Sequence, residues 1–123
     1  MVEIPTIEQA QDDLAHRLEE LAQELDKEFA KEMAGMFVND TPTLIDAIQK
    51  SIDAKDSALL AQTAHKLKGS SLNLGATRMA ALCLELELLG KSGAPISQGT
   101  SIESILEEFQ RVKQFLLQYS EKQ

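Results

Sequence analysis

Aromatic residues are scarce in this chain of 123 residues, which has four phenylalanines, one tyrosine and no tryptophan. Its core must therefore be built from leucine, isoleucine, alanine and methionine, a composition that suits helix packing better than sheet packing. The chain also has no apolar run near the roughly 20 residues that a membrane-spanning helix needs. This absence argues against a membrane protein.

Cysteine is almost absent too, since Cys83 is the only one and no intrachain disulfide can form. Its neighbours Ala81, Leu82 and Leu84 predict a buried thiol that behaves as a small apolar group. The first five residues lack the basic and apolar regions of a signal peptide. We therefore expect a soluble protein in the reducing cytoplasm.

Positive charge is the third shortage, because 12 Lys and Arg face 20 Asp and Glu, for a formal charge of −8. Nonspecific binding to a phosphate backbone needs clustered cations, so this balance argues against a nucleic-acid partner. It leaves room for a local basic patch. With 43% apolar and 26% charged residues, the composition is that of one globular domain.

Apolar residues recur at steps of three and four along most of the chain, the spacing of amphipathic helices. No stretch alternates with period two for long enough to form a strand. No Gly or Pro separates the first two apolar sets, so they form either one long helix or two. The apolar sets lie in residues 7–25, 25–37, 44–52, 60–74, 79–89 and 102–119.

Several start and stop signals divide these segments. Thr41 followed by Pro42 predicts a helix that begins there, with Thr41 as N-cap and Pro42 at the first position. Gly75 is the expected residue just after a helix end. The other predicted helix starts are the capping pairs Thr6 with Gln9 and Thr100 with Glu103, and the N-cap Asp56.

Amphipathic helices this short must bury their apolar faces against one another. Short connections favour antiparallel neighbours. The predicted fold class is all-α, an antiparallel up-and-down four-helix bundle with one or more additional N-terminal helices. We expect residues 1–24 to form a helical extension packed on a bundle of residues 25–123.

One helical segment carries a histidine in an unusual setting. His65 lies about 100° round the helix from a buried stripe, with Lys68 and Gly69 one turn further along. The predicted buried stripe consists of Leu60, Ala64, Leu67, Ser71 and Leu74. A titratable ring, a cation and a bare patch of backbone therefore share one exposed spot.

Glycine inside a helix costs roughly 1 kcal/mol relative to alanine, so Gly69 needs a reason. It allows either a partner's approach to His65 or close packing between helices; its position off the buried stripe favours the first. A lone histidine is more often structural, but an imidazole beside a lysine suits nucleophilic attack on a phosphoryl group. The spacing His-x-x-Lys-Gly-Ser-Ser therefore favours phosphoryl chemistry at His65.

The run from Ala64 to Ala76, His-Lys-Leu-Lys-Gly-Ser-Ser at its centre, closely resembles the signature of histidine-containing phosphotransfer (HPt) domains of multistep phosphorelays. Upstream, Phe37–Pro42 is similar to that family's helix break. The resemblance continues downstream through Met79–Cys83 to Glu87, and it covers roughly residues 25–119.

This resemblance implies a role for each site residue. His65 would accept a phosphoryl group from a receiver-domain aspartate and pass it to another receiver. Lys68 would assist electrostatically, and Gly69 would leave room for the receiver. Glu87 is either a plain surface residue or the group that binds the other ring nitrogen and leaves the outer nitrogen free to attack.

The resemblance also implies a carrier rather than an enzyme, with no bound cofactor or metal; Mg²⁺ would belong to the partner receiver. The partners would be receivers of a hybrid histidine kinase and of a downstream regulator, with the carrier a monomer. We expect the docking surface to include Ala61, Lys66, Leu72 and Arg78, although Lys66 would equally be explained as a solvated lysine.

Three rival classes fit less well. The dimerisation helices of a histidine kinase place an acidic residue after the histidine, where this chain has Lys66. A di-metal carboxylate bundle needs Glu three residues before a histidine, and neither His16 nor His65 has one. The third rival is an adaptor bundle in which His65 is merely structural. His16, without neighbouring Lys and Gly, is predicted to be a surface histidine.

Overall fold

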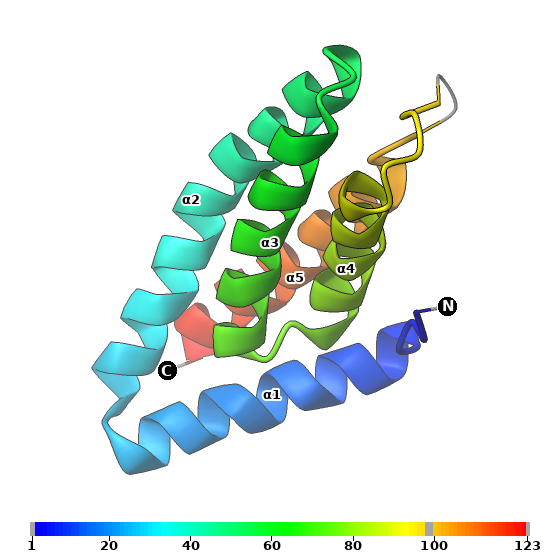
Figure 1. The fold of residues 1–123 in the computed structure, drawn as a ribbon. Helices are drawn as coiled ribbons and strands as arrows, with labels where there is room; N and C mark the ends of the chain where they lie inside the picture. Colours follow the sequence, from blue (N-terminus) through cyan, green and yellow to red (C-terminus); the bar gives the residue numbers. More distant parts are fainter. Residues whose placement is uncertain (1, 98–99, 123) are drawn as a thin grey trace.

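A computed structural model describes residues 2–97 and 100–122, and within them it contains helices and no strand. The fold class is all-α, as predicted (Figure 1). The five helices are α1 (Ile7–Glu24), α2 (Lys27–Asp53), α3 (Ser57–Leu74), α4 (Thr77–Lys91) and α5 (Glu103–Lys122).

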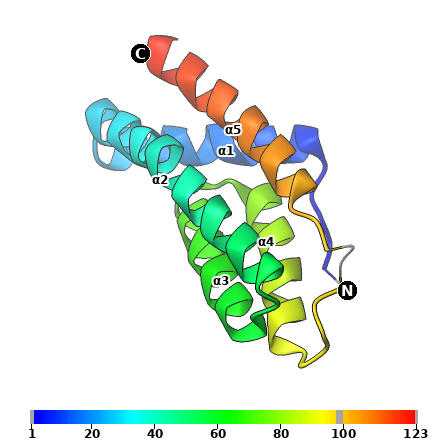
Figure 2. The ribbon, with the colours of Figure 1, turned by 90° about the horizontal axis from the view of Figure 1, so that it is seen from above.

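Helices α2 to α5 run alternately up and down and form the four-helix bundle, whereas α1 lies crosswise over one end of it (Figure 1). The second view shows α1 beneath α5 and the start of α2, with the N-terminal segment running down beside α4 (Figure 2). One face of α1 is apolar and buried against the bundle through Ala10, Leu14, Leu18 and Leu21.

The first two apolar sets are separate helices. Leu25 and Asp26 lie between α1 and α2, and the Asp26 carboxylate accepts a hydrogen bond of 2.7 Å from the Phe29 N–H. Asp26 is thus an N-cap, which satisfies an otherwise unpaired N–H and lets the chain turn without Gly or Pro. Thr6 caps α1 as predicted, accepting from the Gln9 N–H at 3.1 Å.

The predicted helix start at Thr41 and Pro42 is wrong, because α2 continues through Pro42 without interruption. Proline in a helix interior costs about 3 kcal/mol, chiefly because it cannot donate to the carbonyl four residues earlier, here that of Val38. Pro42 is exposed, whereas Thr41 is buried within the stripe that packs both halves of α2 onto the bundle. Tertiary packing therefore outweighs the local signal.

The predicted capping pair of Thr100 and Glu103 is also wrong, because α5 begins only at Glu103. The Ser101 hydroxyl accepts the hydrogen bond from the Glu103 N–H at 3.0 Å. The Thr100 hydroxyl instead lies 3.2 Å from that of Ser97. Ile102, the residue just before α5, is buried.

Helices α3 and α4 form a tight antiparallel hairpin, and its geometry creates the site described below. The Asp56 carboxylate caps α3, and Gly75 ends it with a φ of 84°, both as predicted. The Gly75 N–H donates to the Leu72 carbonyl, and the next N–H donates to Ser71, a Schellman motif. The predicted stripe of α3 is buried in full.

Candidate functional site

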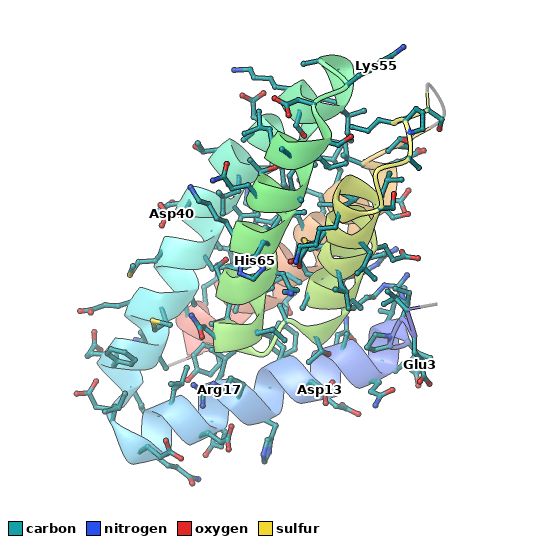
Figure 3. All side chains as sticks on the ribbon, in the orientation of Figure 1. Glu3, Asp13, Arg17, Asp40, Lys55 and His65 are labelled. Atoms are coloured by element: carbon teal, nitrogen blue, oxygen red, sulfur yellow. The ribbon has the colours of Figure 1, made fainter. Side chains whose placement is uncertain are left out.

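His65 lies midway along α3, and Figure 3 shows it on the outer surface of that helix. Its side chain is 64% exposed, although the neighbouring Ala64 is fully buried. The angular position of His65 round α3 therefore puts its ring beside the buried stripe. One edge of the ring faces α4, and the other edge faces solvent. An exposed imidazole held against a packed helix is accessible and has a fixed position.

The α4 residue that faces this ring is Glu87. One carboxylate oxygen of Glu87 lies 2.8 Å from Nδ1 of His65, although the two residues are 22 positions apart in sequence. The Glu87 side chain is only 2% exposed. The contact implied by the family resemblance is therefore present, and Glu87 is a buried carboxylate rather than a plain surface residue.

Two lysines share this carboxylate with the histidine. Nζ of Lys68 lies 2.7 Å from one oxygen of Glu87, and Nζ of Lys91 lies 2.9 Å from the other. A buried carboxylate needs such partners, because an unpaired charge would be costly to remove from water. Lys91 was missed at the sequence level; its position four residues after Glu87, one helical turn, was the available signal.

These contacts determine the ionisation of Glu87. The hydrogen bond from Lys68 above all, followed by those from Lys91 and His65, lowers the pKa of Glu87 from 4.5 to about 2, against the effect of burial. Near neutral pH the carboxylate is ionised and can only accept hydrogen bonds. Nδ1 of His65 must then carry the proton, so in the neutral ring the solvent-facing Nε2 has the free lone pair.

The lowered pKa predicts an acid-sensitive contribution to stability. Since the folded pKa lies below the unfolded one, this contribution is complete above about pH 4.5 and disappears as the pH falls towards 2. We expect about 2 kcal/mol, allowing for solvent screening of the partly exposed lysines. Urea unfolding of the wild type and Glu87→Gln between pH 2 and 7 measures it.

The two unfolding free energies should differ at pH 7 and approach each other near pH 2, where Glu87 is protonated in the unfolded state and about half protonated in the folded state. A gap of constant size over this range would mean that Glu87 contributes through packing rather than through its charge. The paired comparison is needed because other carboxylates of this acidic chain also titrate in the same range.

Gly69 follows Lys68 on the exposed side of α3. A Cβ placed on Gly69 would meet nothing within 4 Å, so no neighbouring helix requires glycine at this position. Close helix packing is instead the role of Gly90, whose added Cβ would come within 2.7 Å of the Ala61 backbone nitrogen and of the Ser57 carbonyl oxygen. The packing explanation for Gly69 is thereby removed, and free space beside His65 remains.

The predicted docking residues differ in accessibility. Leu72 is 54% exposed and lies two turns from His65, and Lys66 is exposed as well. Ala61 is half-buried, because it faces the close approach of α4 at Gly90. Leu72 and Lys66 can therefore meet a partner directly, whereas Ala61 offers only part of its surface.

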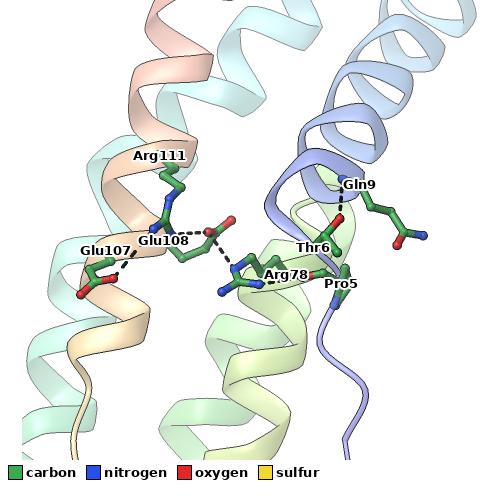
Figure 4. Close-up of polar contacts among 7 residues, drawn as sticks. All are labelled: Pro5, Thr6, Gln9, Arg78, Glu107, Glu108 and Arg111. Carbon is green, nitrogen blue, oxygen red and sulfur yellow. Dashed lines mark hydrogen bonds and ion pairs between the residues drawn. The ribbon is translucent and has the colours of Figure 1, made fainter.

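The structure corrects the assignment of Arg78 to this surface. Nη1 of Arg78 donates to the Pro5 carbonyl at 2.7 Å, and its Nε lies 3.3 Å from the buried carboxylate of Glu108 on α5 (Figure 4). Arg78 precedes Glu87 by nine residues, which places it about half a turn round α4 and about 13 Å along it. It joins the N-terminal segment to α5 and does not face His65.

The remaining chemically notable groups lie outside the site. His16 on α1 is a surface residue, as predicted, 3.8 Å from a Glu20 oxygen. Cys83 is buried, as predicted, and burial followed by the nearby charge of Glu87 raises the pKa of its thiol to about 12. Among residues 2–97 and 100–122, no cluster of three or more His, Cys, Asp or Glu is suited to a metal ion.

None of the helices in the described part of the chain has the length and apolar character needed to cross a membrane.

Two hollows border α3, the helix that carries His65. One hollow lies between α2 and α3, lined by Met36, Asp40 and Asn73 among others, and the other lies between α3, α4 and the N-terminal segment.

Comparison with known proteins gives a consistent result. Residues 32–115 match the family model of the Hpt domain. Over 74 residues the chain is 34% identical to multistep phosphorelay regulator 1 of Schizosaccharomyces pombe (strain 972 / ATCC 24843). That alignment covers 60% of this chain but only 25% of the yeast protein, so the chain spans about a quarter of this curated relative.

The fold also resembles a solved structure, the crystal structure of the HPT domain from an Hpt sensor hybrid histidine kinase of Shewanella. The TM-score is 0.69, with 24% identity, and the match covers 92% of this chain and 93% of the other. At that identity the likeness concerns the fold alone.

Proposed function

This chain belongs to the Hpt domain family, the histidine phosphotransfer domains of multistep phosphorelays, and we propose that His65 is the residue that carries the phosphoryl group. The observation that carries the proposal is the pairing of an exposed imidazole with a buried, ionised carboxylate. That pairing fixes the ring and leaves Nε2 available as the nucleophile.

The proposed reaction begins with an aspartyl phosphate on a receiver domain. The Nε2 lone pair of His65 attacks phosphorus, the bond between phosphorus and the aspartate oxygen breaks, and the aspartate leaves as a carboxylate. The Nδ1 proton stays on the ring throughout, where the charge of Glu87 balances the positive charge that the ring acquires. Transfer to the next receiver is the reverse reaction with a second aspartate.

Lys68 has a different role in this proposal. Its ammonium lies 2.7 Å from Glu87 and its side chain is 22% exposed, so it stands one helical turn from His65 with a partly open path to solvent. A cation there stabilises the charge on the phosphoryl oxygens during transfer. Lys91, which is 62% exposed on the other oxygen of Glu87, keeps the carboxylate paired if Lys68 moves.

Receiver domains are the partners of this family, and we infer a donor from a hybrid histidine kinase and an acceptor from a downstream regulator. The proposed carrier is a monomer without catalytic activity of its own and without a bound metal or other cofactor. The receiver would supply Mg²⁺ to its own phosphorylation site. A cytoplasmic location agrees with the unpaired Cys83.

The proposal is tested by locating the phosphoryl group. Incubation of the protein with phosphorylated receivers and Mg²⁺ should give a label that is lost in acid and stable in base. Mass spectrometry of the digested protein should then assign the label to the peptide that contains His65. An acid-stable label, or one on a peptide that lacks His65, would contradict the assignment.

The rival hypothesis of a docking adaptor makes a different prediction in the same experiment. An adaptor would bind the receiver but remain unlabelled over the full range of receiver concentrations. Calorimetry on the same samples separates the two cases, because it detects binding whether or not a phosphoryl group is transferred.

A further inference from the structure

The segment Val2–Pro5, which precedes the N-cap of α1, is held against the bundle. The Pro5 carbonyl accepts a hydrogen bond of 2.7 Å from Arg78, and Arg78 is itself paired with the buried carboxylate of Glu108 (Figure 4). Ile4 packs against the hydrophobic core. The segment from Val2 to Pro5 is therefore a defined part of the surface beside α4 (Figure 2).

This segment lines one side of a groove of about 620 Å³. Helix α3 supplies the opposite side, and α4 lies between them. Leu72 and Leu88 are about half-exposed in the groove. The groove is mainly apolar, with one anion and one cation; its lining includes Val2, Glu3, Pro5, Lys68, Leu72 and Leu88.

The groove is close to the proposed phosphorylation site. Lys68 lines it and also binds Glu87, the carboxylate that holds His65. Leu72 is seven residues beyond His65, about 10 Å along α3. A standard interface covers about 800 Å² on each partner, which corresponds to a disc of about 16 Å radius. A receiver whose aspartate reaches His65 therefore extends over the α3 side of this groove, at Lys68 and Leu72.

The segment lies outside the part of the chain that matches the family model, which begins at residue 32. Whatever it contributes is thus not part of the shared Hpt pattern. A contact beside a common reaction centre, made by residues outside the common pattern, is suited to distinguishing between related partners.

We propose that the segment Val2–Pro5, held by Arg78, is a specificity-determining part of the docking surface for receiver domains. The receiver that it fits places an apolar side chain in the groove, against Leu72 and Leu88, and a basic residue opposite Glu3. This inference rests on the proposed function, because receivers reach the groove only if they dock at His65.

The test measures the binding of every receiver domain of the source organism by calorimetry, with Val2→Asp, Glu3→Lys and the wild type. We expect Val2→Asp to weaken the preferred receiver at least about tenfold, because it places a charge in an apolar contact. Glu3→Lys should change the order of preference among receivers. Leu117→Asp, an exposed position on α5, is the control and should bind as the wild type does.

Unchanged affinities and an unchanged order of preference in both segment variants would overturn the inference. That result is distinct from failure of the proposed function, in which no receiver labels His65 of the wild type. Circular dichroism should show wild-type helix content in both variants, since neither residue belongs to a helix or to the buried core.

Discussion

His65→Gln is expected to accept no phosphoryl group from any receiver while keeping its fold. The amide has no nitrogen lone pair that can attack phosphorus, so the loss should be complete rather than partial. Because the His65 ring is 64% exposed, its replacement removes little packing, and the free energy of unfolding should change by less than about 1 kcal/mol. Phosphotransfer assays and thermal unfolding measure the two effects.

His16→Gln is the matched control, since His16 is the other histidine of the chain and lies on the surface of α1. It should accept the phosphoryl group at the wild-type rate. Label that persists in His65→Gln and disappears in His16→Gln would move the phosphorylation site to α1 and would leave the Glu87 cluster without a function in transfer.

Gly69→Leu is expected to make the protein slightly more stable and much less active. A leucine is about 0.8 kcal/mol more favourable than glycine inside a helix, and a Cβ at this position meets nothing within 4 Å. The same side chain would fill the space beside His65 that a receiver needs. Misplacement of reacting groups by about 1 Å can cost 100-fold, so we expect at least that loss in single-turnover transfer.

Gly90→Ala provides the opposite comparison within the same hairpin. Its Cβ would lie 2.7 Å from backbone atoms of α3, so we expect a loss of about 1–3 kcal/mol in stability. A graded series at position 69, from Ala to Leu, should lower transfer progressively without loss of stability. Wild-type transfer by Gly69→Leu would refute the access argument, whatever the change in stability.

Much of this architecture was predictable because strong helical periodicity and capping residues agree with the packing. The buried stripe of α3, its Asp56 cap and its Gly75 end were predicted from local pattern, and the structure has all three. Once the buried stripe of α3 is known, the exposure of His65 follows from its position about 100° round the helix from that stripe. Resemblance to the family offered Glu87 as a residue that could face the ring, with a plain surface position as the alternative, and the structure shows the contact at 2.8 Å.

The errors have a common cause, which is that long-range packing outweighs a local signal. Thr41 and Pro42 are a helix start by local rules, yet the buried face of α2 continues across them. Arg78 was predicted to be part of the docking surface, as a cation that would complement a receiver's acidic pocket. No local pattern could reveal that its partners are the Pro5 carbonyl and Glu108, 73 and 30 residues away.

The α3–α4 hairpin has a consequence for how the site forms during folding. His65 and Glu87 are 22 residues apart and are joined by a turn of only two residues, Gly75 and Ala76. Closing so short a loop has a small entropic cost, and contacts of low sequence separation form quickly. We therefore expect the cluster of His65, Lys68, Glu87 and Lys91 to assemble from one local unit of the chain, before α1 and α5 complete the bundle around it.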